Sequence, residues 1–443
     1  MFLREVPMLS AIVPLLTMFL STSGSDSWPG WRGPHGSGVA EGSPPIEWSE
    51  SKNVRWKTPI PGRGLACPIV WGDRVYLTTA VGTGKKVDAP APKDEDQRGG
   101  RGPRGTPPPI EEQDFVVLAL ERKSGAIVWQ KKVATAMPHE GTHPDGTYAS
   151  PTPTTDGERV YASFGSYGIY ALTMAGELAW TTDLGDMKVY NSFGEGSSPV
   201  LCGDLLLVNW DHEGDSFLVA LDKATGKELW RAARPQGTSW TTPLVVAAGD
   251  QLEIVVAGPR TVAYDVATGK ELWHQGDSQP GGLIASPVAL DELVLLTIGS
   301  RGGGEVRAVV APAPADAAKE GEPALWTKRA DVPHVSSPLA YEGRVYFLKQ
   351  NSGLISVLDA TSGELVYGPE RLEKVSDVYA SPVAASGRLY IAGRDGTVEV
   401  LGAWPVETIG VNSLDDPIDA SPAIAGDELF LRGRGNLYCI AEK

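Results

Sequence analysis

Cysteine is scarce in this chain, with 3 residues among 443, namely Cys67, Cys202 and Cys439. An odd number cannot pair completely, and no Cys-x-x-Cys or Cys/His zinc spacing occurs, so we expect buried thiols rather than a disulfide framework. Basic residues are also few, 39 against 55 acidic, which gives a net charge of −16. This balance argues against nucleic-acid binding and against docking on anionic lipid, since both need a basic face.

Long apolar runs are absent except at the N-terminus, where Val6 to Leu20 is interrupted by two prolines. Arg4 precedes this run and small residues follow it at 21–23, which predicts a signal peptide at 1–23 and then an N-terminal extension at 24–52. The alternative interpretation is that this N-terminal apolar run forms a buried strand instead of a signal peptide. The run is too short and too broken by proline for a membrane span. We therefore expect a soluble exported protein, periplasmic or extracellular, with no membrane span after signal removal.

Glycine and proline are plentiful, at 52 and 35 residues, and a small residue followed by Pro begins each unit of a repeat. The eight copies are Cys67-Pro68, Ser150-Pro151, Ser198-Pro199, Thr242-Pro243, Ser286-Pro287, Ser337-Pro338, Ser381-Pro382 and Ser421-Pro422. Most start 40 to 51 residues apart, and each unit contains four short β-type runs. This period predicts an all-β fold, a single eight-bladed β-propeller of four-stranded antiparallel blades over 53–443.

Nearly every fourth strand carries an aromatic residue at a fixed place. These residues are Trp129, Trp180, Trp230, Trp273, Trp326 and Tyr367. We interpret them as packing between blades, because stacking on a cofactor would not require the same position in nearly every blade. The last unit stops at Cys439-Ile440 without a fourth strand, whereas residues 53–60 carry an equivalent Trp56. These residues are predicted to complete the last blade and close the ring. Blade seven, near 406–411, lacks a clear aromatic.

Two segments interrupt the repeat. Residues 82–113 fall between the second and third strands of blade one and are rich in Gly, Pro and Arg. We expect a disordered low-complexity insertion there, although its Arg-Gly part also admits nucleic-acid contact. A smaller Ala/Pro-rich excursion covers 311–323 in blade five.

The repeat resembles the pyrroloquinoline-quinone-like (PQQ-like) propeller repeat, which is found in quinoprotein alcohol dehydrogenases and in BamB. The motifs that carry this resemblance are, in order, Ser-Pro-Val, Gly-Asp-x-Val-Tyr and Ala-Leu-Asp-x-x-Thr-Gly-Lys-Glu-Leu-Trp. Residues 28–34 and 47–49, which precede the repeats, resemble the N-terminal segments of exported PQQ-like propellers of planctomycete-type bacteria. The resemblance covers 28–443 and implies the fold more than an activity. The chain lacks the adjacent Cys-Cys pair of many of the dehydrogenases and the lipoprotein Cys of BamB. No cofactor is therefore expected, and PQQ with calcium belongs only to the dehydrogenase alternative.

The long, chemically rich loops should share one face of the propeller, at the mouth of its central channel, and we place any site there. The candidate ligand or partner residues are His139, His143, Tyr148, Tyr190, Asn191, Trp210, Asp211, His212, Trp240, Arg260, Arg301, His334 and Arg394. None is assigned a catalytic role.

Residues 139–143 formally match the His-Glu-x-x-His zinc-protease pattern, which needs a helix. Pro138 and Pro144 flank the match and Gly141 lies inside it, so a helix is not expected. A looser metal site with His212 and Asp211 stays open beside a purely structural role. We interpret the chain as a monomeric, non-enzymatic binding or scaffold protein with a protein or polymer partner in the cell envelope. The resemblance to BamB suggests a role in envelope or outer-membrane protein assembly. The alternatives are a PQQ-dependent dehydrogenase and a metal-dependent hydrolase.

Overall fold

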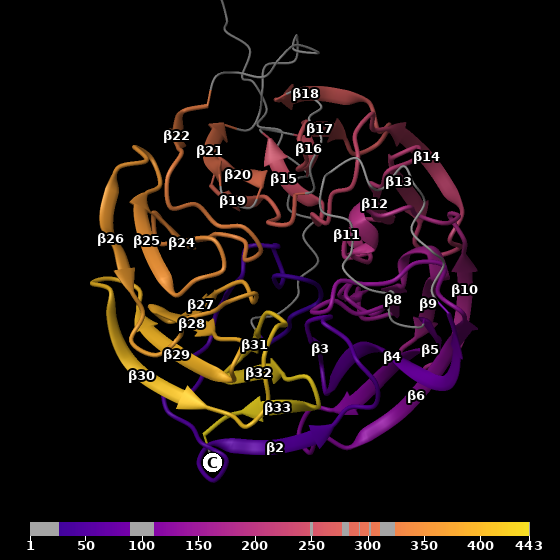
Figure 1. Ribbon diagram of the computed structural model, residues 1–443, viewed down its shortest axis with the longest axis horizontal. Coiled ribbons are helices and arrows are strands. Elements are labelled where there is room, and N and C mark those ends of the chain that lie inside the picture. Colours follow the sequence, from indigo (N-terminus) through magenta and orange to yellow (C-terminus); the bar gives the residue numbers. More distant parts are fainter. Residues whose placement is uncertain are drawn as a thin grey trace, which may run out of the picture.

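The computed structural model describes residues 26–88, 110–248, 251–276, 283–291, 293–300, 303–310 and 324–442. Eight four-stranded antiparallel sheets surround a central axis, as Figure 1 shows, so the predicted eight-bladed propeller is confirmed. The described helical elements are two single 3₁₀ turns, η3 (Gly165–Tyr167) and η4 (Tyr190–Ser192). The predicted signal peptide, the 311–323 excursion and Arg301 lie outside the described residues.

The first four blades follow one another along the chain. Their strands are β3 (Ile69–Trp71), β4 (Arg74–Val87), β5 (Ile110–Glu121) and β6 (Ile127–Ala136) in blade one; β7 (Thr154–Thr155), β8 (Arg159–Ser163), β9 (Ile169–Thr173) and β10 (Leu178–Thr182) in blade two; β11 (Val200–Cys202), β12 (Leu205–Trp210), β13 (Phe217–Asp222) and β14 (Glu228–Ala233) in blade three; β15 (Leu244–Ala248), β16 (Gln251–Val256), β17 (Thr261–Asp265) and β18 (Glu271–Gln275) in blade four.

The remaining blades complete the ring. Their strands are β19 (Val288–Leu290), β20 (Leu293–Ser300), β21 (Gly303–Val310) and β22 (Trp326–Lys328) in blade five; β23 (Leu339–Tyr341), β24 (Arg344–Leu348), β25 (Leu354–Asp359) and β26 (Leu365–Arg371) in blade six; β27 (Val383–Ala385), β28 (Arg388–Ala392), β29 (Thr397–Gly402) and β30 (Glu407–Ser413) in blade seven; β31 (Ala423–Ala425), β32 (Glu428–Arg432), β33 (Asn436–Ile440) and β2 (Val54–Pro59) in blade eight.

Strand position within a blade explains the sequence pattern. A third strand such as β13 is covered by neighbouring blades on both faces, so its residues from Phe217 to Leu221 are all buried and read as a continuous apolar run. The fourth strand β14 lies at the rim and alternates between exposed and partly buried residues. The turn between them is closed by the Gly226 N–H, which donates to the Asp222 carbonyl at 2.8 Å. Gly226 there has φ 73°, the left-handed conformation that glycine adopts without strain.

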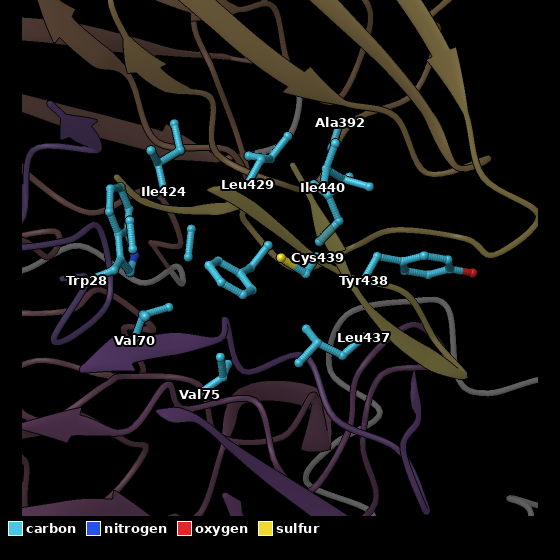
Figure 2. Packing of buried hydrophobic residues seen from close by; sticks show 14 of the residues in the cluster. Trp28, Val70, Val75, Ala392, Ile424, Leu429, Leu437, Tyr438, Cys439 and Ile440 are labelled. Atoms are coloured by element: carbon cyan, nitrogen blue, oxygen red, sulfur yellow. The ribbon is translucent and has the colours of Figure 1, made fainter. Parts of the chain in front are cut away.

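Strand β2 closes the ring as predicted. It pairs antiparallel with β33, and Trp56 lies opposite Cys439. The two chain ends therefore share one sheet, and the C-terminus lies beside β2 in Figure 1. Figure 2 shows the apolar cluster at this junction, where Trp28 and Val70 face Ile424 and Cys439 from blade eight. Burial of this cluster joins the beginning of the chain to its end.

The fourth-strand tryptophans pack on the next blade. The indole N–H of Trp180 donates to the Lys223 carbonyl at 3.0 Å, and Gly226 of the same turn lies so close to the ring that a Cβ there would come within 2.5 Å of it. The same donation to a turn of the following blade is made by Trp56, Trp129, Trp230 and Trp326. Blade seven has no such aromatic, and in blade eight the third and fourth strands, β33 and β2, are not joined by a turn.

A ring of hydrogen bonds joins the eight innermost strands. In seven of the eight small-residue–Pro pairs, the backbone N–H donates to the side-chain oxygen of the corresponding residue one blade on, at 2.9 to 3.2 Å. The members are Cys67, Thr152, Ser198, Thr242, Ser286, Ser337, Ser381 and Ser421, and Ser421 returns to the Cys67 sulfur. Blade two uses Thr152-Pro153, so the assignment of its repeat start to Ser150-Pro151 was wrong by two residues.

The N-terminal extension enters the central channel from the side that carries the short turns, here called the turn face. Trp28 exchanges two backbone hydrogen bonds with Val70 at 2.8 Å, and β1 (Val39–Ala40) pairs parallel with β27 as a fifth strand of blade seven. The chain then leaves past the turn of blade eight, where the Ser43 N–H donates to Asp427 at 2.7 Å. The extension is thus part of the propeller core, and indigo segments lie near the centre of Figure 1.

The insertion in blade one is shorter than the sequence suggested. Strands β4 and β5 stay paired out to Val87 and Ile110, beyond the boundary placed at 82 and 113. Side-chain contacts such as Lys85 Nζ to Glu112 at 2.8 Å stabilise this extended ribbon. Residues 89–109, the low-complexity centre, lie outside the described part of the chain.

Candidate functional site

The face opposite the turn face, here called the loop face, carries the long connections and is crossed by residues 137–150. At one end of this segment, His139 contacts blade two: its Nε2 lies 2.8 Å from the Met187 carbonyl. At the other end, Asp145 reaches Arg394 of blade seven at 2.8 Å. Burial would raise the pKa of Asp145, but the Arg394 guanidinium outweighs it and the pKa lies below its ordinary value. The segment therefore spans the channel mouth, where the sequence placed a site.

Two small clefts remain beside this crossing segment, over blades two and three, and Glu195 lines both. Each has room for little more than a water molecule. The Glu195 carboxylate accepts from the Ser166 N–H at 2.7 Å and from its hydroxyl at 2.6 Å. Burial raises the pKa of Glu195 to about 7, and these two hydrogen bonds only partly oppose it. Neither cleft accommodates a large planar ligand.

An exposed aromatic group stands next to these clefts. It consists of His143, Tyr190, Phe193 and Trp240 and is called the aromatic platform below. Phe193 stacks on Trp240 with ring centroids 6.5 Å apart, and His143 meets its ring edge-on at 4.9 Å. Tyr190 and Phe193 remain 45% and 39% exposed. An aromatic cluster that is partly open to water is a candidate interaction site.

Backbone contacts fix the loop that carries the platform. The Tyr190 N–H donates to the Thr238 hydroxyl at 2.9 Å, and the Trp240 indole donates to the Gly194 carbonyl at 2.6 Å. Between the two exposed aromatics, Asn191 and Ser192 have φ of 52° and 51°, which costs free energy in non-glycine residues. The loop is thus held in a strained shape that directs Tyr190 and Phe193 outward.

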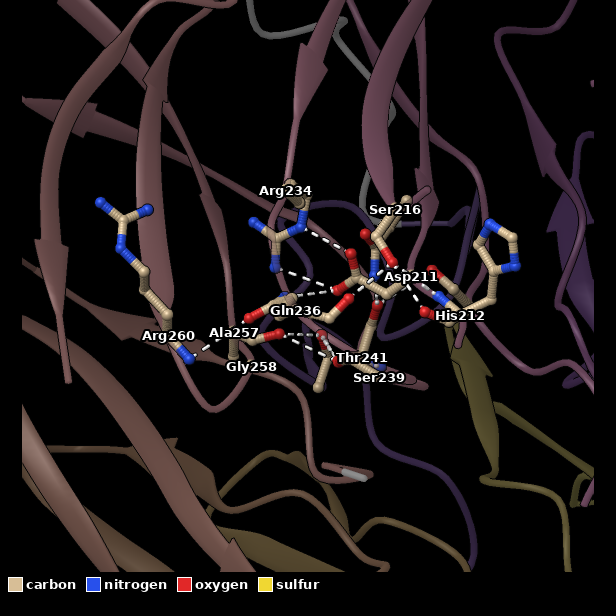
Figure 3. Close-up of polar contacts among 12 residues, drawn as sticks. Asp211, His212, Ser216, Arg234, Gln236, Ser239, Thr241, Ala257, Gly258 and Arg260 are labelled. Carbon is tan, nitrogen blue, oxygen red and sulfur yellow. Dashed lines mark hydrogen bonds and ion pairs between the residues drawn. The ribbon is translucent and has the colours of Figure 1, made fainter. Parts of the chain in front are cut away.

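Three predicted partner residues, Trp210, Asp211 and His212, are buried and cannot meet a partner from the surface. Figure 3 shows Asp211 in a bidentate pair with Arg234, at 2.7 and 3.0 Å, and the Gln236 amide donates to the same carboxylate at 2.7 Å. The His212 ring accepts from the Lys188 N–H. Burial explains the difference, because strand β12 continues to Trp210 and carries these residues under the loops.

The histidines do not form a metal site. His139 is engaged by the Met187 carbonyl and lies 3.2 Å from the Tyr167 hydroxyl, while His143 pairs with Asp145 at 3.7 Å. In the described ranges, no three His, Cys, Asp or Glu side chains are placed to hold a metal ion. Residues 139–143 are not helical, as expected from their prolines.

The other predicted residues are scattered around the loop face. Arg260 pairs with Glu271 at 2.6 Å, and the Tyr148 hydroxyl donates to the Glu140 carbonyl at 3.0 Å. His334 is partly buried in the connection after β22. Tyr190, Asn191, His143 and Trp240 are the members that the fold brings together.

Glu195, Phe193 and Ser166 were missed from the sequence. Glu195 lies in a Gly-Glu-Gly stretch that reads as an ordinary acidic loop, and only the fold places it against Ser166. Phe193 follows Tyr190 by three residues, so a search for aromatics clustered in loops could have found it.

A quinone with its calcium ion does not fit the described geometry. On the turn-face side the N-terminal extension pairs with the innermost strands of blades one and seven, and residues 137–150 cross the other side. The two clefts described above are too small for a quinone, and in the described ranges no three His, Cys, Asp or Glu side chains are placed to hold a cation.

Comparisons with known proteins agree with this architecture. The family model described as "Outer membrane protein assembly factor BamB" matches residues 113–282, 166–313 and 214–443 in overlapping registers. A search of the curated proteins returns no match. BamB from Moraxella catarrhalis is similar in structure, with 14% identity, coverage of 74% of this chain and 93% of that one, and a TM-score of 0.51.

Dehydrogenases are similar too. A europium-containing methanol dehydrogenase shares 12% identity over 94% of this chain and 91% of its own, with a TM-score of 0.62. The quinohemoprotein alcohol dehydrogenase from Comamonas testosteroni shares 12% over 96% and 82%, with a TM-score of 0.60. At such identities these structures show the fold alone. The family-model matches span about three quarters of the sequence, and the chain belongs to this BamB-type family of PQQ-like β-propellers.

Proposed function

We propose that this chain is an exported, non-enzymatic binding protein that docks a protein partner on the aromatic platform of its loop face. The observation that carries the proposal is the exposure of Tyr190 and Phe193 on a loop whose backbone is strained and hydrogen-bonded in place. A rigid aromatic surface loses little conformational entropy on binding, which favours it as an interaction site.

The family supports a partner of protein type. Its model is described as an assembly factor of the outer membrane, and a role in envelope assembly is the corresponding proposal for this chain. The predicted signal peptide supports export to the periplasm or the exterior. In the described part of the chain, no helix has the length and apolar character needed to span a bilayer.

The test is affinity capture from an envelope extract with the mature protein. The informative variant is Tyr190→Ser combined with Phe193→Ser, because both side chains are exposed and their loss should leave folding intact. The matched control is Leu229→Ser combined with Leu365→Ser, two exposed apolar residues on outer strands. We expect the platform variant to retain less than a tenth of the captured partner at an unchanged melting temperature.

Two results would contradict the proposal. One is equal capture by the platform variant and the wild type. The other is alcohol oxidation with a dye acceptor after PQQ and calcium are added, which would favour a dehydrogenase.

A further inference from the structure

One of the two loop-face clefts opens beside the aromatic platform. It is lined by Asn209 and Trp240 as well as by Glu195, and it is called the Trp240 cleft below. The chain from Glu195 to Ser197 forms one wall, and Glu195, Ser197 and Trp240 are all partly exposed. Because Trp240 also belongs to the platform, a group bound in this cleft would lie next to a partner docked there.

The hydrogen-bond donors of the Trp240 cleft are already in use. The side chains of Ser197, Thr238, Ser239 and Trp240 donate to carbonyl or carboxylate oxygens at 2.6 to 3.0 Å. All of these oxygens belong to residues that do not line the cleft. The four donors are therefore not available to a ligand, which disfavours an anion.

Asn209 supplies an acceptor that has no partner. It lies on β12, lines the cleft and is 2% exposed. Its amide nitrogen donates to the Thr241 carbonyl at 3.3 Å, and that carbonyl also accepts from the Ser197 hydroxyl. The Asn209 Oδ1 is buried without a hydrogen-bond partner. Because the nitrogen is turned towards Thr241, the oxygen is the polar atom left for the cleft, and an unpaired buried acceptor favours a ligand that donates.

Glu195 supplies a negative charge in the same cleft. Each of its carboxylate oxygens accepts one hydrogen bond from Ser166 and keeps a lone pair for another donor. No lysine or arginine of the described ranges pairs with this carboxylate. Asp211, which also lines the cleft, differs because Arg234 neutralises it at 2.7 Å. A cation is therefore the ligand that Glu195 favours.

The size and the walls of the cleft narrow the choice of cation. It has room for about one water-sized group, which matches an ammonium group but not the larger guanidinium. Met187 and Val189 line it beside Trp240, and such apolar walls suit a methylene chain and attract a cation over the indole ring. In the described ranges no three His, Cys, Asp or Glu side chains are placed to hold a metal ion instead.

We propose that the Trp240 cleft binds a primary ammonium group, which a protein docked on the aromatic platform presents as a lysine side chain. The ammonium group would donate to the Glu195 carboxylate and to the free Asn209 Oδ1. The source of the lysine rests on the proposed function, whereas the affinity of the cleft for an alkylammonium ion does not. The acidic character of the whole chain, with a net charge of −16, favours a basic partner.

Titration with n-butylammonium, which has the length of a lysine side chain, tests the proposal. The melting temperature of the mature protein is measured as n-butylammonium chloride replaces sodium chloride at constant ionic strength. The measurement is made at pH 8, because burial raises the pKa of Glu195 to about 7, while His139 lowers it and Glu140 raises it further. A ligand that binds only the folded state raises the melting temperature in proportion to the logarithm of its concentration above Kd. Tetramethylammonium, which has the same charge and no N–H donor, is the control ligand.

Three variants identify the cleft. Glu195→Gln removes the charge while keeping the shape, and Asn209→Leu removes the free acceptor. Glu140→Gln is the matched control, because Glu140 lines only the neighbouring cleft. We expect the response to n-butylammonium in the wild type and in Glu140→Gln, and an affinity lower by at least about tenfold in the other two variants. An equal response in Glu195→Gln, or an equal response of the wild type to tetramethylammonium, would overturn the proposal.

A crystal of the wild type soaked in n-butylammonium gives an answer that does not depend on variants folding. The proposal expects the ammonium nitrogen within hydrogen-bond distance of the Glu195 carboxylate and the Asn209 Oδ1. A cleft without ligand density at a concentration that saturates the thermal response would overturn it.

Partner capture separates this inference from the proposed function. We expect Glu195→Gln to capture less of the partner than the wild type does. If Glu195→Gln captures as much as the wild type while Tyr190→Ser combined with Phe193→Ser loses the partner, the lysine is overturned and the platform stands. Equal capture by the platform variant contradicts the proposed function, and the n-butylammonium response of the cleft is then judged by itself.

Discussion

The Asp211–Arg234 pair gives the sharpest test of the interior of the loop face. Its two side chains are 0% and 1% exposed, and the Arg234 guanidinium also donates to the Tyr264 hydroxyl at 2.9 Å. Replacing Arg234 by Met leaves the Asp211 carboxylate buried without its cation. Removing one partner of such a pair costs about 3–5 kcal/mol of unfolding free energy.

The assay is chemical and thermal unfolding of the purified protein. With about 2.1 cal/mol/K of unfolding entropy per residue over roughly 400 residues, that cost lowers the melting temperature by about 4–6 °C. The double variant Asp211→Leu/Arg234→Met removes both charges and should unfold within about 2 kcal/mol of the wild type, because a buried pair is often replaceable by apolar residues. If Arg234→Met costs less than about 1 kcal/mol, or the double variant is as unstable as the two single changes added together, the pair is not desolvated as described.

Three further outcomes follow from the fold. Trp56→Ala should lower the unfolding free energy by about 3–5 kcal/mol in denaturant titration, because it empties the closing junction, whereas Trp404→Ala, 45% exposed, should change it by less than about 1 kcal/mol. Gly226→Ala forces a Cβ onto a tryptophan ring and should lower the unfolding free energy by more than Gly72→Ala does. At Gly72 no atom lies within 4 Å of the added Cβ, so only backbone strain of about 1–2 kcal/mol is added. Equal losses of unfolding free energy would refute the docking role of the turn at Gly226. The folded state holds the Glu195 proton up to about pH 7, whereas the unfolded chain releases it near pH 4.5. The unfolding free energy should therefore fall as the pH rises through this interval. Glu195→Gln should make this fall with pH less steep, and an unchanged pH dependence would contradict the raised pKa of Glu195.

Repeat spacing was enough to predict the ring and its closure by residues 53–60. The reason is physical, because a blade cannot bury its own faces, so each copy must present the same apolar runs. The start of blade two was misplaced because Ser150-Pro151 and Thr152-Pro153 have the same form, and only the hydrogen-bonded ring separates them.

The site was harder to predict than the fold. Asp211 and His212 have the composition of exposed loop residues, and burial under neighbouring loops is set by tertiary packing that no local pattern records. The course of residues 26–48 through the channel could not be predicted from the sequence either. Its contacts join positions more than 300 residues apart, as between Arg32 and Pro382. Tyr190 and Trp240 lie together on the loop face because the order of the strands sends both of their connections to that side.

Site-specific photo-crosslinking in envelope extract tests the central claim most directly. A photoreactive phenylalanine derivative is introduced at Tyr190 on the aromatic platform, and at Leu229 on an outer strand as the control. The account predicts a discrete crosslinked protein at position 190 and none at 229. Crosslinks at 229 with none at 190 would show that the partner docks elsewhere and would contradict the account.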